Sequence, residues 1–211
     1  VALAEPERRH RIVHDIPDDG FLQIAVLDKA HAMWPTDDGN IDYEPTEEQS
    51  VAAIARRTGV PVMQVILDHL VGLDGNGMIY TPFFNYSYGD LGFTYEAHRH
   101  PHTRMGLSDA GAHCGVICDG GMPTFMLTHW ARDRVRGPKL SLEHVVHRQT
   151  RNTAELHGLC DRGLIAPGMK ADINVIDFDA LGFDMPRMAY DLPASGRRLV
   201  QTARSEEHTS E

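Results

Sequence analysis

The stretch "RMGLSDAGAHCG", residues 104–115, carries the strongest fold signal in the chain. A short apolar run stops directly at Ser108 and Asp109, and Gly111 follows two residues later. In parallel α/β proteins, and in the eight-stranded barrel above all, catalytic groups gather at the carboxyl ends of strands, where loops converge. Asp is also a common turn former. The spacing alone therefore leaves two alternatives open for Asp109, a catalytic carboxylate or an ordinary strand terminator.

The segments around this stretch predict alternating helices and strands, an α/β fold class. Thr46 and Gln49 fit a capping box whose helix ends at Gly59, and Pro61 opens a second helix that ends near Gly72. Further helices are expected over residues 91–98, from about 123 and from 142, the last followed by a shorter helical turn, and strands over residues 21–28, 78–84, 103–108 and 171–177. Strands separated by helical sequence predict parallel pairing through a crossover.

The composition favours a globular protein with a small-molecule or protein partner. The chain has 211 residues, 42% of them hydrophobic and 24% charged, which is enough to bury a sizeable core. A formal net charge of -10 argues against a nucleic-acid partner, because phosphates would be repelled over most of the surface. The first fifty residues hold 12 acidic residues against 4 Lys and Arg, so -8 of that charge lies in the first quarter.

Cysteine usage and apolar run lengths predict a cytoplasmic protein without a membrane span. Three cysteines, an odd number in a chain of this length, argue against a disulfide framework. No run approaches 18 apolar residues, and no basic leader with a long apolar region opens the chain. Residues 204–211, "RSEEHTSE", are predicted to be a non-native tail, with a disordered polar tail as the alternative. The oligomeric state is left open.

Five further motifs follow one another along the chain: "FFNY", "HPHTRMGLSDAG", "PTFMLTHWARDR", "RQTRNTAELHGLCDRGLIAPGMKADINVIDFD" and "DLPASGRRLVQTA". In this order they resemble the C-terminal part of the N-acyl-D-amino-acid deacylases, the D-aminoacylase branch of the amidohydrolase superfamily. The resemblance runs from about residue 43 to 203. It is specific because the motifs come in sequence, whereas a lone S-D-x-G-x-H would be weak evidence.

The resemblance implies a zinc-dependent hydrolase of N-acylated small molecules. Residues 1–157 would form the C-terminal part of a (β/α)8 barrel, and residues 158–203 would add a strand segment to a small β-domain. Asp109 would end the last barrel strand beside the metal, accept a proton from metal-bound water and pass it to the departing amine. His113, Asn85 and Tyr86 are expected to contact the substrate at the same mouth, although turn chemistry explains Asn85 nearly as well.

The family's upstream H-x-H strand, ligand cysteine and further ligand histidines have no convincing counterpart among residues 1–80. A (β/α)8 barrel takes about 250 residues, so this chain can hold only its last strands. We therefore expect a piece of an enzyme that binds zinc poorly, hydrolyses nothing alone and exposes an apolar strand edge. Two alternatives remain, an amidohydrolase acting on another amide or a cyclic amide, and a non-catalytic α/β binding module.

Other histidines and cysteines are interpreted as structural. His98, His100 and His102 in "HRHPH" precede the expected strand, and the residues from there to Asp109 span about 23 Å at about 3.3 Å each, which places them at the opposite barrel end. Cys114 and Cys118 are expected to be packing residues. Core positions are expected for a further set on the later helices, namely His129, Trp130, His144 and His147.

Overall fold

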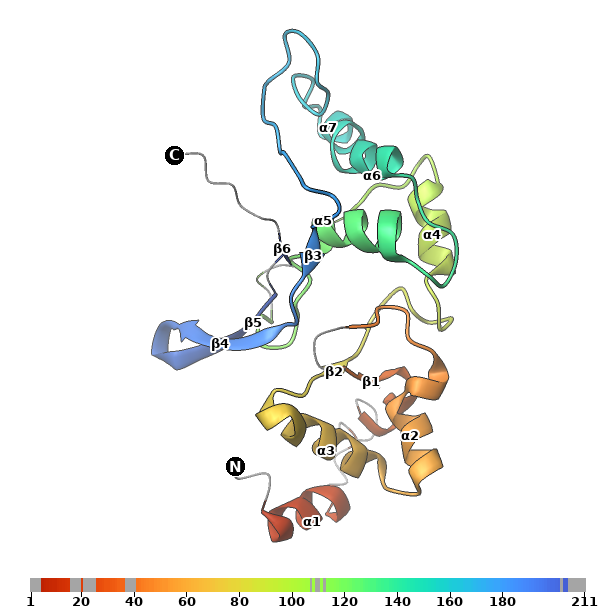
Figure 1. The fold of residues 1–211 in the computed structure, drawn as a ribbon, viewed down its shortest axis with the longest axis vertical. Helices are drawn as coiled ribbons and strands as arrows, with labels where there is room; N and C mark the ends of the chain where they lie inside the picture. The colour runs from red at the N-terminus through yellow and green to blue at the C-terminus, as the bar shows by residue number, and fades with distance from the viewer. Residues whose placement is uncertain are drawn as a thin grey trace. The chain divides into compact units, whose positions relative to one another are not determined.

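The computed structural model describes residues 5–15, 20, 26–36, 41–106, 108, 111, 113–201 and 203–204. These residues divide into two compact units, Val1–Leu91 and Gly92–Glu211 (Figure 1). Each unit is described by itself. The expected strand over residues 21–28 lies mostly outside the described residues, and so does Asp109.

The first unit is mainly helical. In its described residues β1 and β2 pair antiparallel, with Trp34 opposite Tyr80. In chain order its elements are α1 (Pro6–His14), η3 (Ala30–Ala32), β1 (Trp34–Pro35), η4 (Glu47–Gln49), α2 (Val51–Thr58), α3 (Val62–Gly75) and β2 (Ile79–Tyr80). The strand expected over residues 78–84 is therefore confirmed only at Ile79–Tyr80.

Local capping signals explain where α2 begins and ends. The backbone N–H of Thr46 donates to Gln49 Oε1 at 2.8 Å, so the expected capping box forms, but it closes only the short helix η4. Ser50 caps α2 instead, because its Oγ accepts the N–H of Ala53 at 3.2 Å. Gly59 ends α2 in the left-handed region at φ 72°, as expected. In α3 the backbone leaves helical geometry at Gly72, which confirms the predicted end of the regular helix.

The core of the first unit lies between α2 and α3. Val51 is fully buried, and Ala30, Ala55 and Val65 pack around it. Nearby, the indole of Trp34 donates to the carbonyl of Thr46 at 2.7 Å. The helical spacing of apolar residues thus produces the buried face that the sequence indicates.

The described residues of the second unit combine six helical segments with two short sheets. They are α4 (Gly92–Arg99), α5 (Met122–Phe125), η5 (Met126–Asp133), α6 (Leu142–Gln149), α7 (Arg151–Leu156), β3 (Gly182–Phe183), β4 (Arg187–Leu192), η6 (Pro193–Ser195), β5 (Gly196–Val200) and β6 (Ala203–Arg204). The expected helices over residues 91–98, from 123 and from 142 are confirmed. Ser141 caps α6 by accepting the N–H of His144 at 3.2 Å. The helix that starts at α5 continues as a π-helix, η5.

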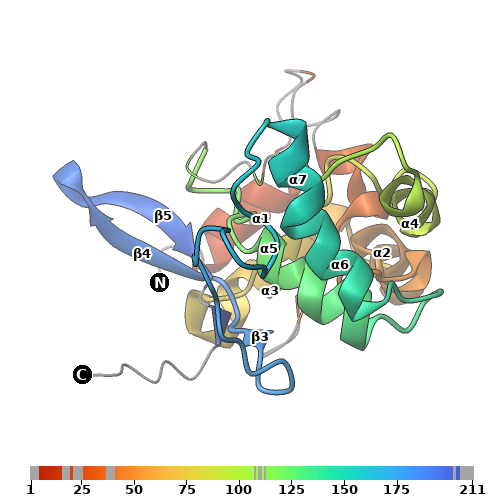
Figure 2. The same ribbon diagram turned by 90° about the horizontal axis from the view of Figure 1, so that it is seen from above.

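Strand pairing differs from the expected parallel pattern. Among the described residues every strand pair is antiparallel: β1 with β2, β3 with β6, and β4 with β5, which form a hairpin with Met188 opposite Leu199 (Figure 2). Residues 103–106 and 108 form no strand. Parallel pairing through a crossover needs two neighbouring strands. The apolar run at residues 103–108 indicates one strand at most and does not specify its partner.

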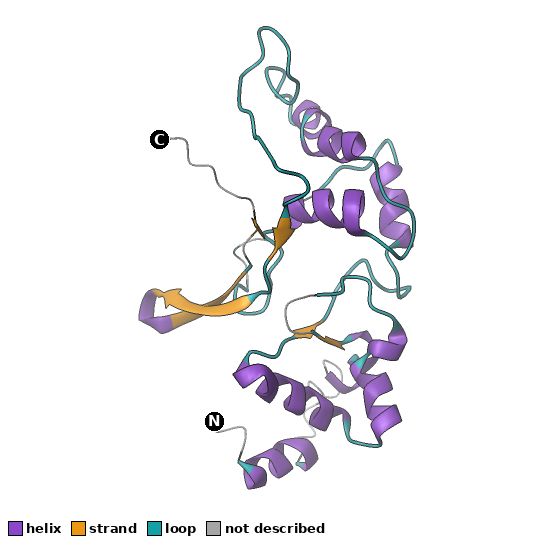
Figure 3. Cartoon of the chain, in the orientation of Figure 1, coloured by secondary structure: helices purple, strands orange, loops and turns teal. Residues whose placement is uncertain are grey.

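The strand expected over residues 171–177 is also wrong. The chain from α7 to β3 runs as one long loop (Figure 3). Ile173 is 59% exposed and Val175 is 97% exposed. An alternating pattern becomes a strand only where another backbone edge accepts its hydrogen bonds, and this loop has none among the described residues.

Helices and strands are therefore mixed, in keeping with the α/β class, and the described residues do not show a barrel. The predicted domain division after residue 157 stays a prediction. Within the described residues, no helix has the length and apolar character that crossing a bilayer requires.

Candidate functional site

Two described residues that follow Asp109 in the sequence have left-handed backbone geometry. Gly111 has φ 94° and His113 has φ 44°, both in the left-handed region that glycine enters easily and other residues enter at a cost. The carbonyl of His113 accepts the N–H groups of Val116 at 2.8 Å and Ile117 at 3.1 Å. Residues 113–117 thus form a hydrogen-bonded turn.

The turn is attached to the C-terminal hairpin. The carbonyl of Cys114 accepts the N–H of Leu199 on β5 at 2.6 Å, and its Sγ lies 3.9 Å from the carbonyl of Arg197. A second attachment lies a few residues on, where a Cβ at Gly121 would collide with the ring of Phe183 on β3. The segment that follows Asp109 is therefore held by residues 182–200.

Cys118, near the turn, does not offer a reactive thiolate. Burial, and then the negative charge of Asp119, raise the pKa of the Cys118 thiol. A raised thiol pKa lowers the fraction of thiolate, which is the form that attacks substrates and binds metals. This agrees with a packing role for Cys118.

The predicted substrate contacts fall in different units. Asn85, in the first unit, is exposed and has φ 66°, a turn conformation that Asn tolerates well. Tyr86 is 7% exposed, its hydroxyl donates to the carbonyl of Pro45 at 2.7 Å, and its ring meets that of Trp34 edge to face at 5.6 Å. His113 belongs to the second unit and is exposed. Whether Asn85, Tyr86 and His113 contact a substrate stays a prediction.

The histidines of "HRHPH" lie at the end of α4 and in the loop after it. Burial, followed by the charges of Arg148 and His144, lowers the pKa of His98 to about 4. Its ring meets the Trp130 indole edge to face at 5.1 Å. His100 and His102 are exposed, with ring centroids 5.5 Å apart. His98 is thus a packed, neutral imidazole near neutral pH.

The expectations for the later histidines are met in part. Trp130 is 2% exposed, and the His129 ring stacks on Phe125 at 4.6 Å, so both pack as expected. His144 is half-buried, with Nε2 at 3.1 Å from the carbonyl of His98. His147 is exposed, so its expected core position is wrong. The reason is helical periodicity, which turns Val145 and Arg148 inward and leaves Val146 and His147 exposed.

The described residues do not fit a zinc centre. Across them, no group of three or more His, Cys, Asp or Glu side chains lies close enough to hold a metal ion. A structural or catalytic zinc site takes at least three protein ligands. No step of a reaction is therefore assigned to a metal.

Two buried arginines are the features that sequence reasoning missed. Arg134 is 2% exposed, with its guanidinium 4.7 Å above the Trp130 ring and 5.6 Å from that of Tyr95. Arg148 is 4% exposed and donates to the carbonyl of Thr103 at 2.6 Å and to its Oγ at 2.8 Å. Burial, then the charge of Arg104, lowers the pKa of Arg148.

Arg148 holds the start of the segment that leads toward Ser108. Arg148 holds the backbone at Thr103, five residues before Ser108. The spacing of Trp130 and Arg134, four residues apart, was a signal for a cation–π contact that could have been recognised. No comparable local pattern indicates Arg148, or the buried Glu44, whose Oε1 accepts the N–H of Leu91 at 3.1 Å.

A family comparison identifies the chain. The model of the amidohydrolase family matches residues 7–206, nearly the whole length and the entire turn around Asp109. The chain belongs to the amidohydrolase family. It is accordingly a hydrolase of that superfamily, and the amidohydrolase part of the sequence resemblance is confirmed. Searches of curated proteins and of solved structures found no match.

Proposed function

We propose that this amidohydrolase cleaves the amide bond of N-acyl amino acids, of D configuration, with Asp109 as its general base. The observation that carries the proposal is the family match over residues 7–206, which spans the ordered motifs around "GLSDAGAH". The left-handed turn at Gly111 and His113 supports it, because such a turn leaves room for a ligand close to the backbone.

The chemistry assigned to Asp109 is a proton transfer in two stages. Its carboxylate accepts a proton from water as the water oxygen bonds to the amide carbonyl carbon. The same proton then passes to the amide nitrogen as the C–N bond breaks, which releases a carboxylic acid and a free amino acid. A carboxylate suits this role because it can gain and return one proton without leaving its position.

Zinc is the proposed cofactor, since amidohydrolases are commonly metal-dependent. A bound zinc ion would acidify the attacking water and polarise the carbonyl. Asp109 is the proposed contact to the metal in this chain. The other ligands do not occur as a cluster in the described part of the chain, so we assign them to residues outside it.

The proposed architecture is a (β/α)8 barrel whose C-terminal part is residues 1–157, with residues 158–203 contributing to a small β-domain. The hydrogen bond from the Leu199 N–H to the Cys114 carbonyl supports this architecture, because it joins the turn that follows Asp109 to residues 158–203. His113 and Asn85 are the proposed substrate contacts with exposed polar groups, whereas the Tyr86 hydroxyl already bonds to Pro45. The cytoplasmic location stays a prediction.

The test is Asp109→Asn in the complete reading frame that contains this chain. We expect turnover of an N-acyl-D-amino acid to fall by about 100- to 10,000-fold, the usual contribution of a general base, with little change in KM. Asp74→Asn is the matched control, because Asp74 is an exposed turn residue in a conformation that Asn also adopts. Unchanged turnover in Asp109→Asn would overturn the proposal.

A substrate panel separates the alternatives. N-acyl-D-amino acids, their L counterparts and a cyclic amide are compared under one condition. Hydrolysis of the cyclic amide alone would move the assignment to another branch of the superfamily. A protein that binds an N-acyl amino acid without turning it over, and does so equally well as Asp109→Asn, would be a binding module. The 211-residue chain by itself is expected to hydrolyse none of them.

A further inference from the structure

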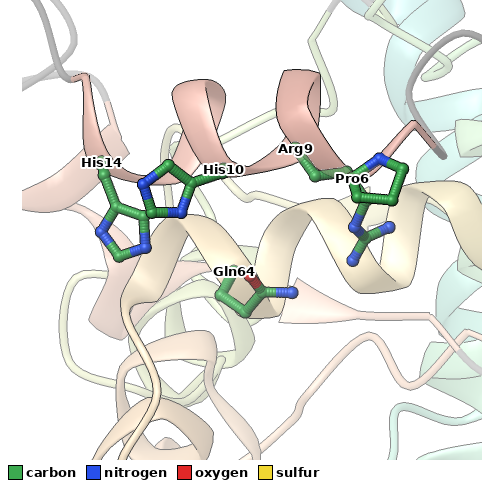
Figure 4. A pocket seen from close by; sticks show the side chains of 5 residues that line it. All are labelled: Pro6, Arg9, His10, His14 and Gln64. Atoms are coloured by element: carbon green, nitrogen blue, oxygen red, sulfur yellow. The ribbon is translucent and has the colours of Figure 1, made fainter.

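A pocket of about 470 Å³ lies between α1 and α3 in the first unit, and none of its lining residues is assigned to hydrolysis. Two imidazoles are its most distinctive groups. His10 and His14 lie one helical turn apart on α1, with ring centroids 4.4 Å apart (Figure 4). The pocket is lined by Pro6, Arg9, His10, His14 and Gln64.

The charges around the two imidazoles are already paired. Each arginine of α1 lies in an ion pair: Arg8 with Glu5 at 3.6 Å, Arg9 with Asp68, and Arg11 with Asp15 at 3.7 Å. Gln64 Nε2 also donates to Asp68, at 2.6 Å. In the described part of the chain, no ion pair or hydrogen bond is recorded for either imidazole. The ring nitrogens of His10 and His14 are thus available to a ligand from solvent.

The helix fixes the distance between the two rings. Residues four apart share one face of an α-helix, so one ion can reach both side chains. The helix is anchored on α3 by the ion pair of Arg9 with Asp68 and by Val13, which is 3% exposed. Imidazole is a preferred ligand of nickel, copper and zinc ions and a poor ligand of magnesium.

We propose that His10 and His14 bind a divalent ion of the late first transition row, with water completing its coordination. Arg8, Arg9 and Arg11 lie beside the two histidines, and their ion pairs with carboxylates reduce the repulsion that they would exert on a cation. Two protein ligands make this a surface site of modest affinity, distinct from the catalytic zinc. The inference does not rest on the proposed function.

The test uses Ni²⁺ as the probe, because Ni²⁺ does not oxidise the three cysteines and broadens nearby proton resonances. Calorimetric titration of the 211-residue chain is expected to show saturable Ni²⁺ binding and none of Mg²⁺. His10→Ala and His14→Ala should each lower the Ni²⁺ affinity by at least about tenfold. His31→Ala is the matched control, because His31 is an exposed histidine of the same unit and lies alone on η3.

A second measurement keeps the test independent of affinity alone. In NMR spectra, sub-stoichiometric Ni²⁺ should broaden the ring resonances of His10 and His14 before that of His31. His10 and His14 are exposed, so the alanine variants at these positions should keep the circular dichroism spectrum of the parent. Ni²⁺ binding that survives in the His10→Ala/His14→Ala variant, or that disappears in His100→Ala/His102→Ala instead, would overturn the proposal. Binding of inorganic phosphate to the 211-residue chain, with no binding of Ni²⁺, would also overturn the proposal.

Discussion

The core of the first unit and the loop of the second unit use similar apolar residues with opposite results. Val51 on α2 is 0% exposed, whereas Val175 in the loop is 97% exposed. Six large apolar side chains along that loop remain open to solvent: Leu159, Leu164, Ile165, Ile173, Val175 and Ile176. Both regions have the apolar patterning of a regular element, but only the first is a helix that packs against another.

The difference lies in where each element finds its hydrogen bonds. A helix satisfies its backbone groups within its own segment, and α2 needs only Ser50 and Gly59 to define its ends. A strand must find a partner from elsewhere in the chain. The alternating residues 171–177 have no such partner in the described residues, so their side chains gain no burial.

The largest expected effect follows from placing a carboxylate in each region. Val51→Asp puts a charge in a fully buried position and should cost more than about 4 kcal/mol of unfolding free energy. Val175→Asp should change it by less than about 0.5 kcal/mol, because that side chain already meets water. Urea denaturation of both variants measures the contrast. A large loss in Val175→Asp would show that the loop is buried in solution.

An intermediate effect is expected from pH, through His98. Its pKa in the folded chain, about 4, lies below the ordinary value of 6.5, because of burial and the nearby charges of Arg148 and His144. The unfolded chain therefore takes up the proton first, and the free energy of unfolding falls as the pH drops from about 6.5 toward 4. Denaturation across this range should show a weaker slope in His98→Gln.

An exposed histidine of the loop after α4 provides the control. His102→Gln removes an exposed imidazole, so its comparison with His98→Gln separates the effect of His98 from that of losing one histidine. Equal slopes in His98→Gln and the parent would mean that His98 takes up its proton in the folded chain as readily as an open imidazole.

The smallest expected effect concerns the helix caps. Ser50→Ala and Ser141→Ala should each cost about 1 kcal/mol, because each removes the oxygen that accepts the N–H at the start of a helix. Thr46→Ala should cost less than about 0.5 kcal/mol, since its box closes only η4. Thermal denaturation ranks the three. A larger loss in Thr46→Ala than in Ser50→Ala would restore the sequence-based assignment of the cap.

The helices could be predicted well because their signals are local. Gly59, Pro61 and Ser141 each mark a boundary within one turn of the residue that it affects. The strand pair of the first unit could not, since β2 pairs with a strand remote in sequence, with Pro35 opposite Ile79. Nothing in an apolar run specifies its partner or its direction.

The candidate site was predictable where the chain uses a motif. "GLSDAGAH" contains the glycine and the histidine that adopt left-handed geometry after Asp109. The contacts on either side of Asp109 come from residues remote in sequence. Leu199 on β5 donates to the Cys114 carbonyl, and Arg148 donates to the Thr103 carbonyl. Such contacts follow from the packing of whole elements, so a reading of local spacing misses them.

The two tryptophans give each unit its own optical reporter. The chain contains only Trp34 and Trp130, one in each unit, and they are 5% and 2% exposed. The guanidinium above Trp130 and the peptide carbonyl bonded to Trp34 give the two indoles different surroundings, and hence different emission. Single-tryptophan versions can therefore report whether the two halves melt in one cooperative transition or in two.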